Sequence, residues 1–174
     1  MNIEDLMTRD VKCCGPEDTL DVAARLMWEN DVGCIPITDG RGQALAMLTD
    51  RDICMAAFTQ GRPLGEIRAK SAMSASLHAV APRDSLAKAE LVMKEFQVRR
   101  LPVVDGEGRL QGVLSVNDIA REAARERPQR QRAVTSDEVA VTLAGVCRPR
   151  VCLVPPHDDS ALPRTARAAP ALSV

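Results

Sequence analysis

Two hydroxyl–carboxylate pairs are the residues of this chain whose types and spacing suggest ligand chemistry. Thr49 and Asp52 follow the apolar run 46–48, and Ser115 and Asp118 follow the run 112–114, 66 positions later. A hydroxyl residue after a buried strand caps the next helix, and a carboxylate three positions on lies in the first helical turn. Such a carboxylate can accept hydrogen bonds from two ligand hydroxyls, and a helix start attracts phosphate. The simpler alternative is that both pairs only cap helices and complement the helix dipole.

The arrangement recurs because most of the chain is an internal repeat. Residues 7–53 align with residues 73–119 without a gap, and 15 of these 47 pairs are identical. Unrelated segments of average residue usage would share only about three. The sequence therefore predicts two copies of one fold.

Composition and charge limit the classes of function that this chain can have. The chain has 174 residues and a net charge of −1, so no overall field directs it toward nucleic acid or membrane. Five arginines between 121 and 132 are interpreted as a solvated helix end and linker, with a nucleic-acid arm as the alternative. No apolar run approaches the roughly 20 residues of a membrane span, and the start lacks a signal-peptide pattern. We expect a cytoplasmic protein that binds neither membrane nor nucleic acid.

The pattern along the chain predicts a mixed α/β (α+β) fold. Each copy reads as strand, helix, strand, turn, strand and helix, and the apolar faces of the two first helices include Trp28 and Phe96. A capping signal at Thr135 predicts a further helix near 136–147, and the tail, rich in Pro, Ala and Arg, is expected to be disordered. The expected divisions are 1–65 and 66–125 for the two repeats, 126–148 for a linker and C-terminal helix, and 149–174 for the tail.

The sequence gives no sign of catalysis or of a structural metal. The only histidines are His78 and His157, and no Cys-x-x-Cys or catalytic motif is present. We therefore expect no enzyme and no required cofactor. Most of the six cysteines are expected to be buried small hydrophobes, and the alternative is that Cys13 or Cys14 pairs with Cys147.

The repeated motifs resemble those of a tandem pair of CBS domains, also called a Bateman module. The resemblance rests on the Pro-x-x-[Thr/Ser]-Leu segment, the hydrophobic-Pro-hydrophobic-x-Asp strand and the hydroxyl-x-x-Asp-Ile helix start, in order and twice. It spans residues 1 to about 124, and the remainder is similar, more weakly, to small stand-alone two-CBS proteins of bacteria. It implies two repeats packed about a pseudo-two-fold axis, with two clefts that bind AMP, ADP, ATP or other adenosine-containing ligands, and a homodimer.

The resemblance also implies roles for individual residues. It assigns ribose binding to Asp52 and Asp118, and phosphate binding to Thr49 and Ser115. Arg100 stands where phosphate-binding members carry a basic residue, whereas the first copy has Cys34 there and Ala46 where the family usually has Gly. We expect the second cleft to be the better nucleotide site. Its expected contacts are His78 to Val80 at the base, Arg100 and Ser115 at phosphate and Asp118 at ribose, while the first cleft retains Arg51.

The function expected from the sequence is therefore a non-catalytic regulatory module. It binds an adenosine nucleotide and signals to an unidentified protein partner in trans, because no catalytic domain is attached. The alternative is a structural or stress-response CBS dimer with no nucleotide ligand.

Overall fold

The computed structural model describes residues 1–124 and 134–147, so the expectations for most of the linker and for a disordered tail lie outside these residues. Each repeat contributes two helices and a two-stranded antiparallel hairpin. The first copy comprises α1 (Leu20–Glu29), β1 (Cys34–Thr38), β2 (Ala44–Thr49) and α2 (Asp50–Gln60), and the second comprises α3 (Leu86–Phe96), β3 (Arg100–Val104), β4 (Leu110–Ser115) and α4 (Val116–Ala124). Short 3-10 turns η1 (Ile3–Asp5), η2 (Leu64–Glu66) and η3 (Ala69–Ser71) precede or connect the copies, and α5 (Ser136–Val146) follows them.

The two hairpins have the same register, shifted by one repeat. Cys34 pairs with Thr49 in the first hairpin, and Arg100 pairs with Ser115 in the second. Both turns end in a glycine, Gly42 or Gly108, with φ of +79°, a conformation that glycine adopts at little cost. The sequence prediction of two copies of one fold is confirmed in this element order and pairing.

The expected first strand of each copy is much shorter than predicted. Residues 11–14 contribute one parallel bridge, Cys14 to Ile37, and residues 77–80 contribute one, Val80 to Val103. In both segments only the last residue joins the ladder, and the residues before it have no regular secondary structure. A short apolar run predicts extended backbone better than it predicts pairing, because pairing depends on the neighbouring strand.

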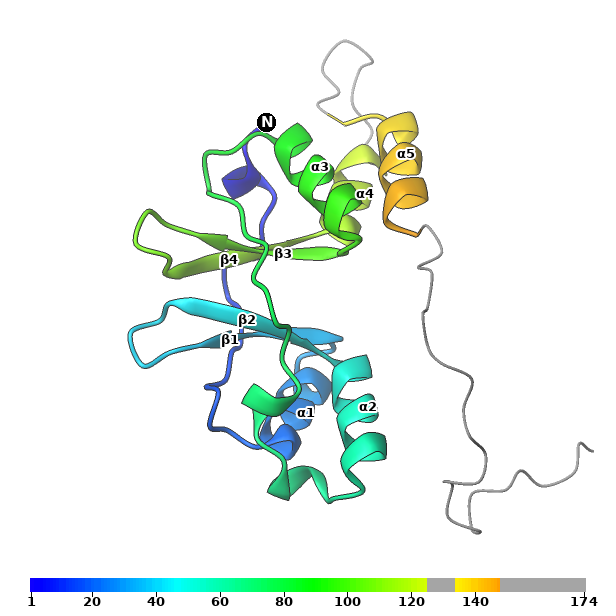
Figure 1. The fold of residues 1–174 in the computed structure, drawn as a ribbon. Helices are drawn as coiled ribbons and strands as arrows, with labels where there is room; N and C mark the ends of the chain where they lie inside the picture. The colour runs from blue at the N-terminus through cyan, green and yellow to red at the C-terminus, as the bar shows by residue number, and fades with distance from the viewer. Residues whose placement is uncertain (125–133, 148–174) are drawn as a thin grey trace, which may run out of the picture.

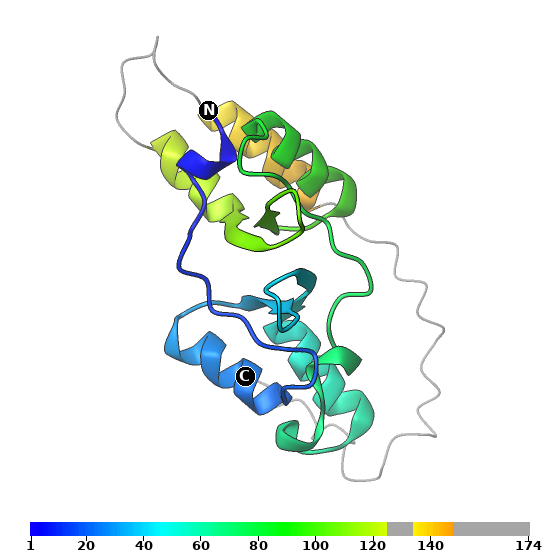
Figure 2. The ribbon, with the colours of Figure 1, turned by 90° about the vertical axis from the view of Figure 1, so that its left-hand side faces the viewer.

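The segments that precede the two repeats are exchanged between the copies. Ile3 and Met7 lie in the hydrophobic core of the second copy, whereas Ile67 and Ala69 lie in the core of the first. Figure 2 shows residues after η1 running from the second copy to the first, and residues after η3 running back. This exchange holds the two copies together, because the core of each copy includes residues from the segment that directly precedes the other copy.

The two hairpins face each other in the centre of the molecule, and the helices lie at its two ends (Figure 1). The hairpin turns are joined directly: Ala44 N–H donates to Gly108 O, and Leu110 N–H donates to Gly42 O, both at 3.0 Å. The copies are therefore related by a pseudo-two-fold arrangement, as the CBS resemblance implied, with the strand ends and helix starts near the surface between them.

Both aromatic residues that were expected to be buried, Trp28 and Phe96, are exposed. Leu20, Ala23 and Met27 form the buried stripe of α1, whereas Trp28 is 88% exposed. Trp28 is one residue past Met27, and each residue advances about 100° around a helix, so its side chain leaves the buried face. Phe96 at the end of α3 is 41% exposed. The prediction that these two side chains face the core is wrong.

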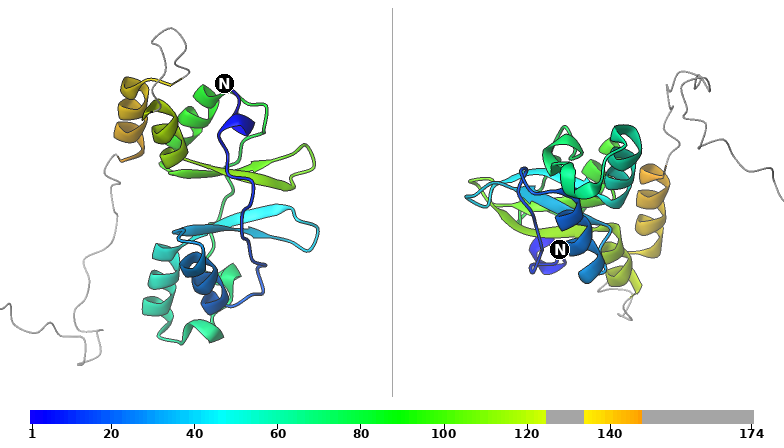
Figure 3. Two further views of the ribbon diagram at one scale, coloured as in Figure 1. Left: turned by 180° about the vertical axis from the view of Figure 1, so that it is seen from behind. Right: turned by 90° about the horizontal axis from the view of Figure 1, so that it is seen from below.

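Helix α5 packs on α3 and α4 at the outer side of the second copy (Figure 3). Its Thr135 N-cap and Glu138 form a reciprocal capping box, which confirms the predicted helix start. Val146 joins the core of the second copy. No helix in the described part of the chain has the length and apolar character required to cross a bilayer.

Candidate functional site

Both predicted hydroxyl–carboxylate pairs form reciprocal capping boxes at helix starts. In the first helix start, residues 49–52, the Thr49 N–H and hydroxyl donate to Asp52 Oδ2 at 2.9 and 2.7 Å. In the second helix start, residues 115–118, the Ser115 N–H and hydroxyl donate to Asp118 Oδ2 at 2.8 and 2.6 Å. The simpler capping role is thus fulfilled at both positions. A ligand would therefore have to bind to polar groups that these capping bonds do not use, such as the second carboxylate oxygen.

The remaining carboxylate oxygens distinguish the two helix starts. Asp52 is partly exposed, and no donor among the described residues contacts its Oδ1. Asp118 is only 7% exposed, and its Oδ1 accepts a hydrogen bond from the Arg121 guanidinium. A ribose needs an accessible acceptor for its two hydroxyls. Asp52 offers one in this conformation, whereas Asp118 would first have to release Arg121.

Arg100 connects the two copies. Its backbone pairs with Ser115, but its Nη2 would lie 3.8 Å from a Cβ placed on Gly33, whose other close neighbour is the Asp50 carboxylate. Burial raises the pKa of the Cys34 thiol, the Arg100 charge opposes that rise, and Asp50 and Asp52 add to it. The positive charge of Arg100 therefore acts at the first helix start, which the sequence analysis did not group with it.

The remaining predicted ligand contacts, Arg51, His78 and Val80, lie in different environments. Arg51 is exposed in the first turn of α2. The His78 ring stacks on Phe96, with centroids 3.7 Å apart and an interplanar angle of 15°. Val80 is 3% exposed and belongs to the core of the second copy, so its side chain is engaged in packing.

Sequence reasoning did not identify the cavity beside the first helix start. This cavity, of about 390 Å³, is lined by Gly33, Asp50 and Ile53, and by Trp28 and neighbouring residues of α1. A Cβ at Gly33 would stand 3.2 Å from Asp50 Oδ2, so a larger residue would crowd this wall. One signal was available in the sequence. Gly33 aligns with Arg99 of the second copy, so the first copy has the smallest residue at the position beside the cavity.

The cysteines do not form the alternative disulfide. Cys13, Cys14, Cys34, Cys54 and Cys147 are free, which excludes a bond from Cys13 or Cys14 to Cys147. Cys14 and Cys34 are buried as expected, and the other three are exposed, contrary to the expectation for most cysteines. Within residues 1–124 and 134–147, no group of three or more His, Cys, Asp or Glu side chains could hold a metal ion.

Comparison with known proteins establishes the class. The CBS domain family model matches residues 3–58 and 64–125, which together make up more than half of the chain. The chain belongs to the CBS domain family, and the matched region comprises two repeats.

Several relatives are small proteins of the same kind. The chain is 38% identical over 119 residues to the CBS domain-containing protein YhcV of Bacillus subtilis, covering 68% of this chain and 83% of that protein. It is also 38% identical over 117 residues to Hypoxic response protein 1 of Mycobacterium tuberculosis, covering 67% and 81%. The family model that matches is that of the CBS domain, and CBS domain pairs are generally regulatory modules.

Solved structures show the same fold. Hypoxic Response Protein I, crystallised with two coordinated zinc ions, matches with a TM-score of 0.64 and 36% identity over 70% of this chain and 98% of that one. CBSX2 in complex with AMP matches with a TM-score of 0.62 and 26% identity, over 70% and 95%.

Proposed function

We propose that this chain is a cytoplasmic, non-catalytic regulatory module that binds an adenosine-containing ligand of the AMP, ADP or ATP class and signals to a partner protein in trans. The observation that carries the proposal is the first helix start, where Asp52 Oδ1 is available and Arg100 reaches in from the other copy. A structural relative, CBSX2, was crystallised with AMP, which supports this ligand class. Signalling requires the ligand to favour one conformation of the module over another.

The chemistry of the first helix start suits the two ends of such a ligand. Asp52 Oδ1 can accept hydrogen bonds from both ribose hydroxyls without giving up its bonds to Thr49. The positive end of the α2 helix dipole and the Arg51 and Arg100 guanidiniums supply positive potential for phosphate.

The geometry favours the first site over the second, which reverses the ranking expected from sequence. That ranking placed Arg100 with Ser115 and Asp118 because they belong to the same copy. The Arg100 guanidinium instead lies near Gly33 and Asp50, and Asp118 is buried and paired with Arg121. Ser115, Asp118 and His78 stay candidates for a second, weaker site.

A structural or stress-response dimer without a nucleotide ligand is the alternative. It is favoured by the capping bonds, which engage Oδ2 of each carboxylate in helix capping without a ligand, and by the name of a 38%-identical relative, Hypoxic response protein 1.

A thermal-shift panel with AMP, ADP, ATP, NAD and S-adenosylmethionine separates the two functions. A ligand that binds only the folded state raises the unfolding midpoint by mass action. We expect AMP, ADP or ATP to raise it, and Arg100→Ala to reduce the shift. A panel without any shift would reject nucleotide binding in favour of the structural dimer.

A further inference from the structure

Helix α5 covers a surface of the second copy whose equivalent in the first copy is open. It packs on α3 and α4, lies beyond the region matched by the family model, and places Val146 in the core of the second copy. In the described part of the chain, α1 and α2 carry no corresponding helix, and their Trp28 and Phe58 side chains are largely exposed. The cover is therefore a feature of one copy only.

The two copies differ at buried positions of the helices on which α5 packs. Glu90 of α3 aligns with Ala24 of α1. With the same offset of 66 residues, Glu122 of α4 corresponds to Ala56 of α2. The two glutamates are only 9% and 5% exposed. A surface that serves permanent packing alone would keep the small apolar side chains, because an ionised carboxylate is costly to bury.

Glu90 is the carboxyl group that lies against α5. Thr142 of α5 is beside it and is 1% exposed, and Glu90 Oε1 has no hydrogen-bond partner among the described residues. Burial raises the pKa of Glu90, and the Thr142 hydroxyl and the Lys94 charge only partly oppose this rise. Glu138 of α5 adds to the rise as a like charge. On α4, Glu122 is engaged in an interaction of its own, so the pH response is assigned to Glu90.

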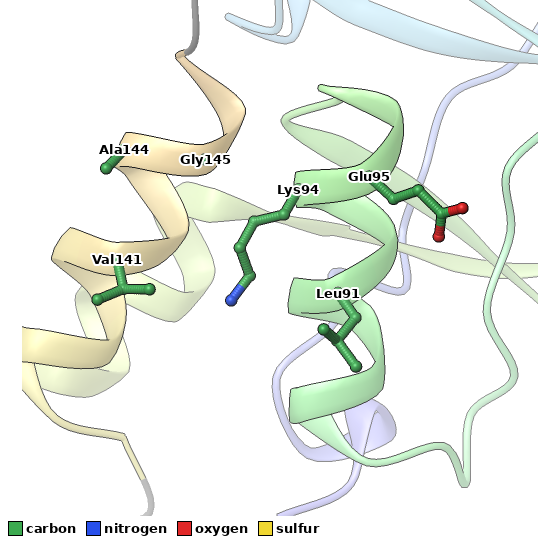
Figure 4. Close-up of a pocket in the computed structure, with 6 residues that line it drawn as sticks. All are labelled: Leu91, Lys94, Glu95, Val141, Ala144 and Gly145. Carbon is green, nitrogen blue, oxygen red and sulfur yellow. The ribbon is translucent and has the colours of Figure 1, made fainter.

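The contact between α5 and α3 is incomplete. A groove of about 670 Å³ lies between them, lined by Leu91, Lys94, Glu95, Val141, Ala144 and Gly145. Figure 4 shows the Lys94 side chain extending from α3 toward α5 across this groove. Helix α5 has 11 residues, of which Thr142, Gly145 and Val146 are buried. A helix shorter than about 12–15 residues is marginal by itself, so α5 depends on this small contact and can open locally.

We propose that α5 is a pH-sensitive latch, which stays on α3 and α4 while Glu90 is protonated and releases more readily when Glu90 ionises. Docking holds the Glu90 carboxyl away from water and near the Glu138 charge, whereas release returns it to solvent. Docking is therefore favoured at low pH and weakens as the pH rises through the docked-state pKa of Glu90. Release opens the α3 and α4 surface, as the equivalent surface of the first copy is open already.

Hydrogen–deuterium exchange of the full chain between pH 5 and pH 8, followed by mass spectrometry, tests the latch. After correction for the intrinsic pH dependence of exchange, the opening constant of α5 should rise about threefold or more, while that of α3 stays unchanged. Glu138 stays ionised in this range, because its bonds to Thr135 lower its pKa, so the α5 cap is intact throughout. Equal opening of α5 at pH 5 and pH 8, or joint opening of α3 and α5, would overturn the proposal.

Matched variants assign the effect to Glu90. Glu90→Gln should keep the low opening constant of α5 at every pH, because the amide does not ionise. Glu95→Gln changes an exposed residue of the same helix and should retain the pH dependence of the wild type. Gly145→Ala should raise opening at every pH without removing that dependence, since its Cβ would lie 2.5 Å from Lys94 Cγ. A wild-type pH dependence in Glu90→Gln would contradict the latch, and circular dichroism verifies the fold of each variant.

Discussion

The exchanged N-terminal segment makes position 112 sensitive to a single methyl group. A Cβ at Gly112 would lie 2.6 Å from the Thr8 carbonyl oxygen and 2.9 Å from Met7 Sδ. Thr8 and Val113 exchange two backbone hydrogen bonds, each of 2.9 Å, so the carbonyl cannot withdraw without breaking them. Gly112→Ala is therefore expected to displace residues 7–8 from β4.

The first copy shows what that displacement looks like. Its equivalent residue is Ala46, which is fully buried, and there the neighbouring Met47 N–H donates to the Ser74 hydroxyl at 3.1 Å in place of a carbonyl. The chain thus accommodates a methyl group at this position only with a different hydrogen-bond arrangement. The second copy has Thr8 where the first has Ser74, so partial adaptation limits the cost of the substitution.

The expected magnitude follows from opposing terms. Overpacking costs about 1–3 kcal/mol, and weakening two backbone bonds costs about 1 kcal/mol each. Replacing a strand glycine returns about 0.5–1 kcal/mol through backbone entropy. We expect Gly112→Ala to lower the free energy of unfolding by about 2–4 kcal/mol.

Urea denaturation followed by circular dichroism measures this change. Gly106→Ala is the matched control, because a Cβ at Gly106 meets nothing within 4 Å. It should change the free energy of unfolding by no more than about 0.5 kcal/mol. If Gly112→Ala is as stable as the wild type, the close packing of residues 7–8 on β4 is refuted.

Two further predictions concern buried titratable groups. Glu90 is 9% exposed under α5, its Oε1 has no hydrogen-bond partner among the described residues, and burial raises its pKa, which the nearby Thr142 hydroxyl only partly offsets. The folded state therefore binds the Glu90 proton more tightly than the unfolded state does. The free energy of unfolding falls as the pH rises through the folded-state pKa, because the buried carboxyl must then ionise. In urea melts, Glu90→Gln should match the wild type near pH 4 and exceed it increasingly toward pH 8; a difference independent of pH would contradict this. Burial, with Asp18 and Cys13, raises the pKa of Cys14 to about 11, so iodoacetamide at pH 8 should label exposed Cys13 well before Cys14 in peptide maps, and equal labelling would refute the burial of Cys14.

The sequence predicted the features that depend on neighbours along the chain. The helix starts at Thr49, Ser115 and Thr135 have capping signals within four residues. The structure contains capping boxes at Thr49 and Thr135, and the Ser115 hydroxyl donates to Asp118. The repeat was detectable because aligned positions keep the same residue types. Such local patterns determine element type and order without knowledge of packing.

The features that sequence reasoning missed depend on contacts between the copies. Nothing near Arg100 in the chain indicates that its guanidinium lies near Gly33, because the pseudo-two-fold arrangement brings them together. The exchange of the segments before each repeat has the same origin. Trp28 was misassigned because it directly follows Met27, and both residues are compatible with an apolar spacing pattern. Packing decides which of the two adjacent side chains is buried.

The central claim is that the first helix start, with Arg100, binds an adenosine nucleotide. Calorimetric titration with AMP of the wild type, Asp52→Ala and Asp118→Ala tests it most directly, with circular dichroism confirming that both variants fold. Loss of a charged acceptor costs about 1.5–3 kcal/mol, so Asp52→Ala should weaken binding about tenfold or more, while Asp118→Ala should change the dissociation constant less than about threefold. Equal loss in the two variants, or no heat of binding with the wild type, would contradict the account.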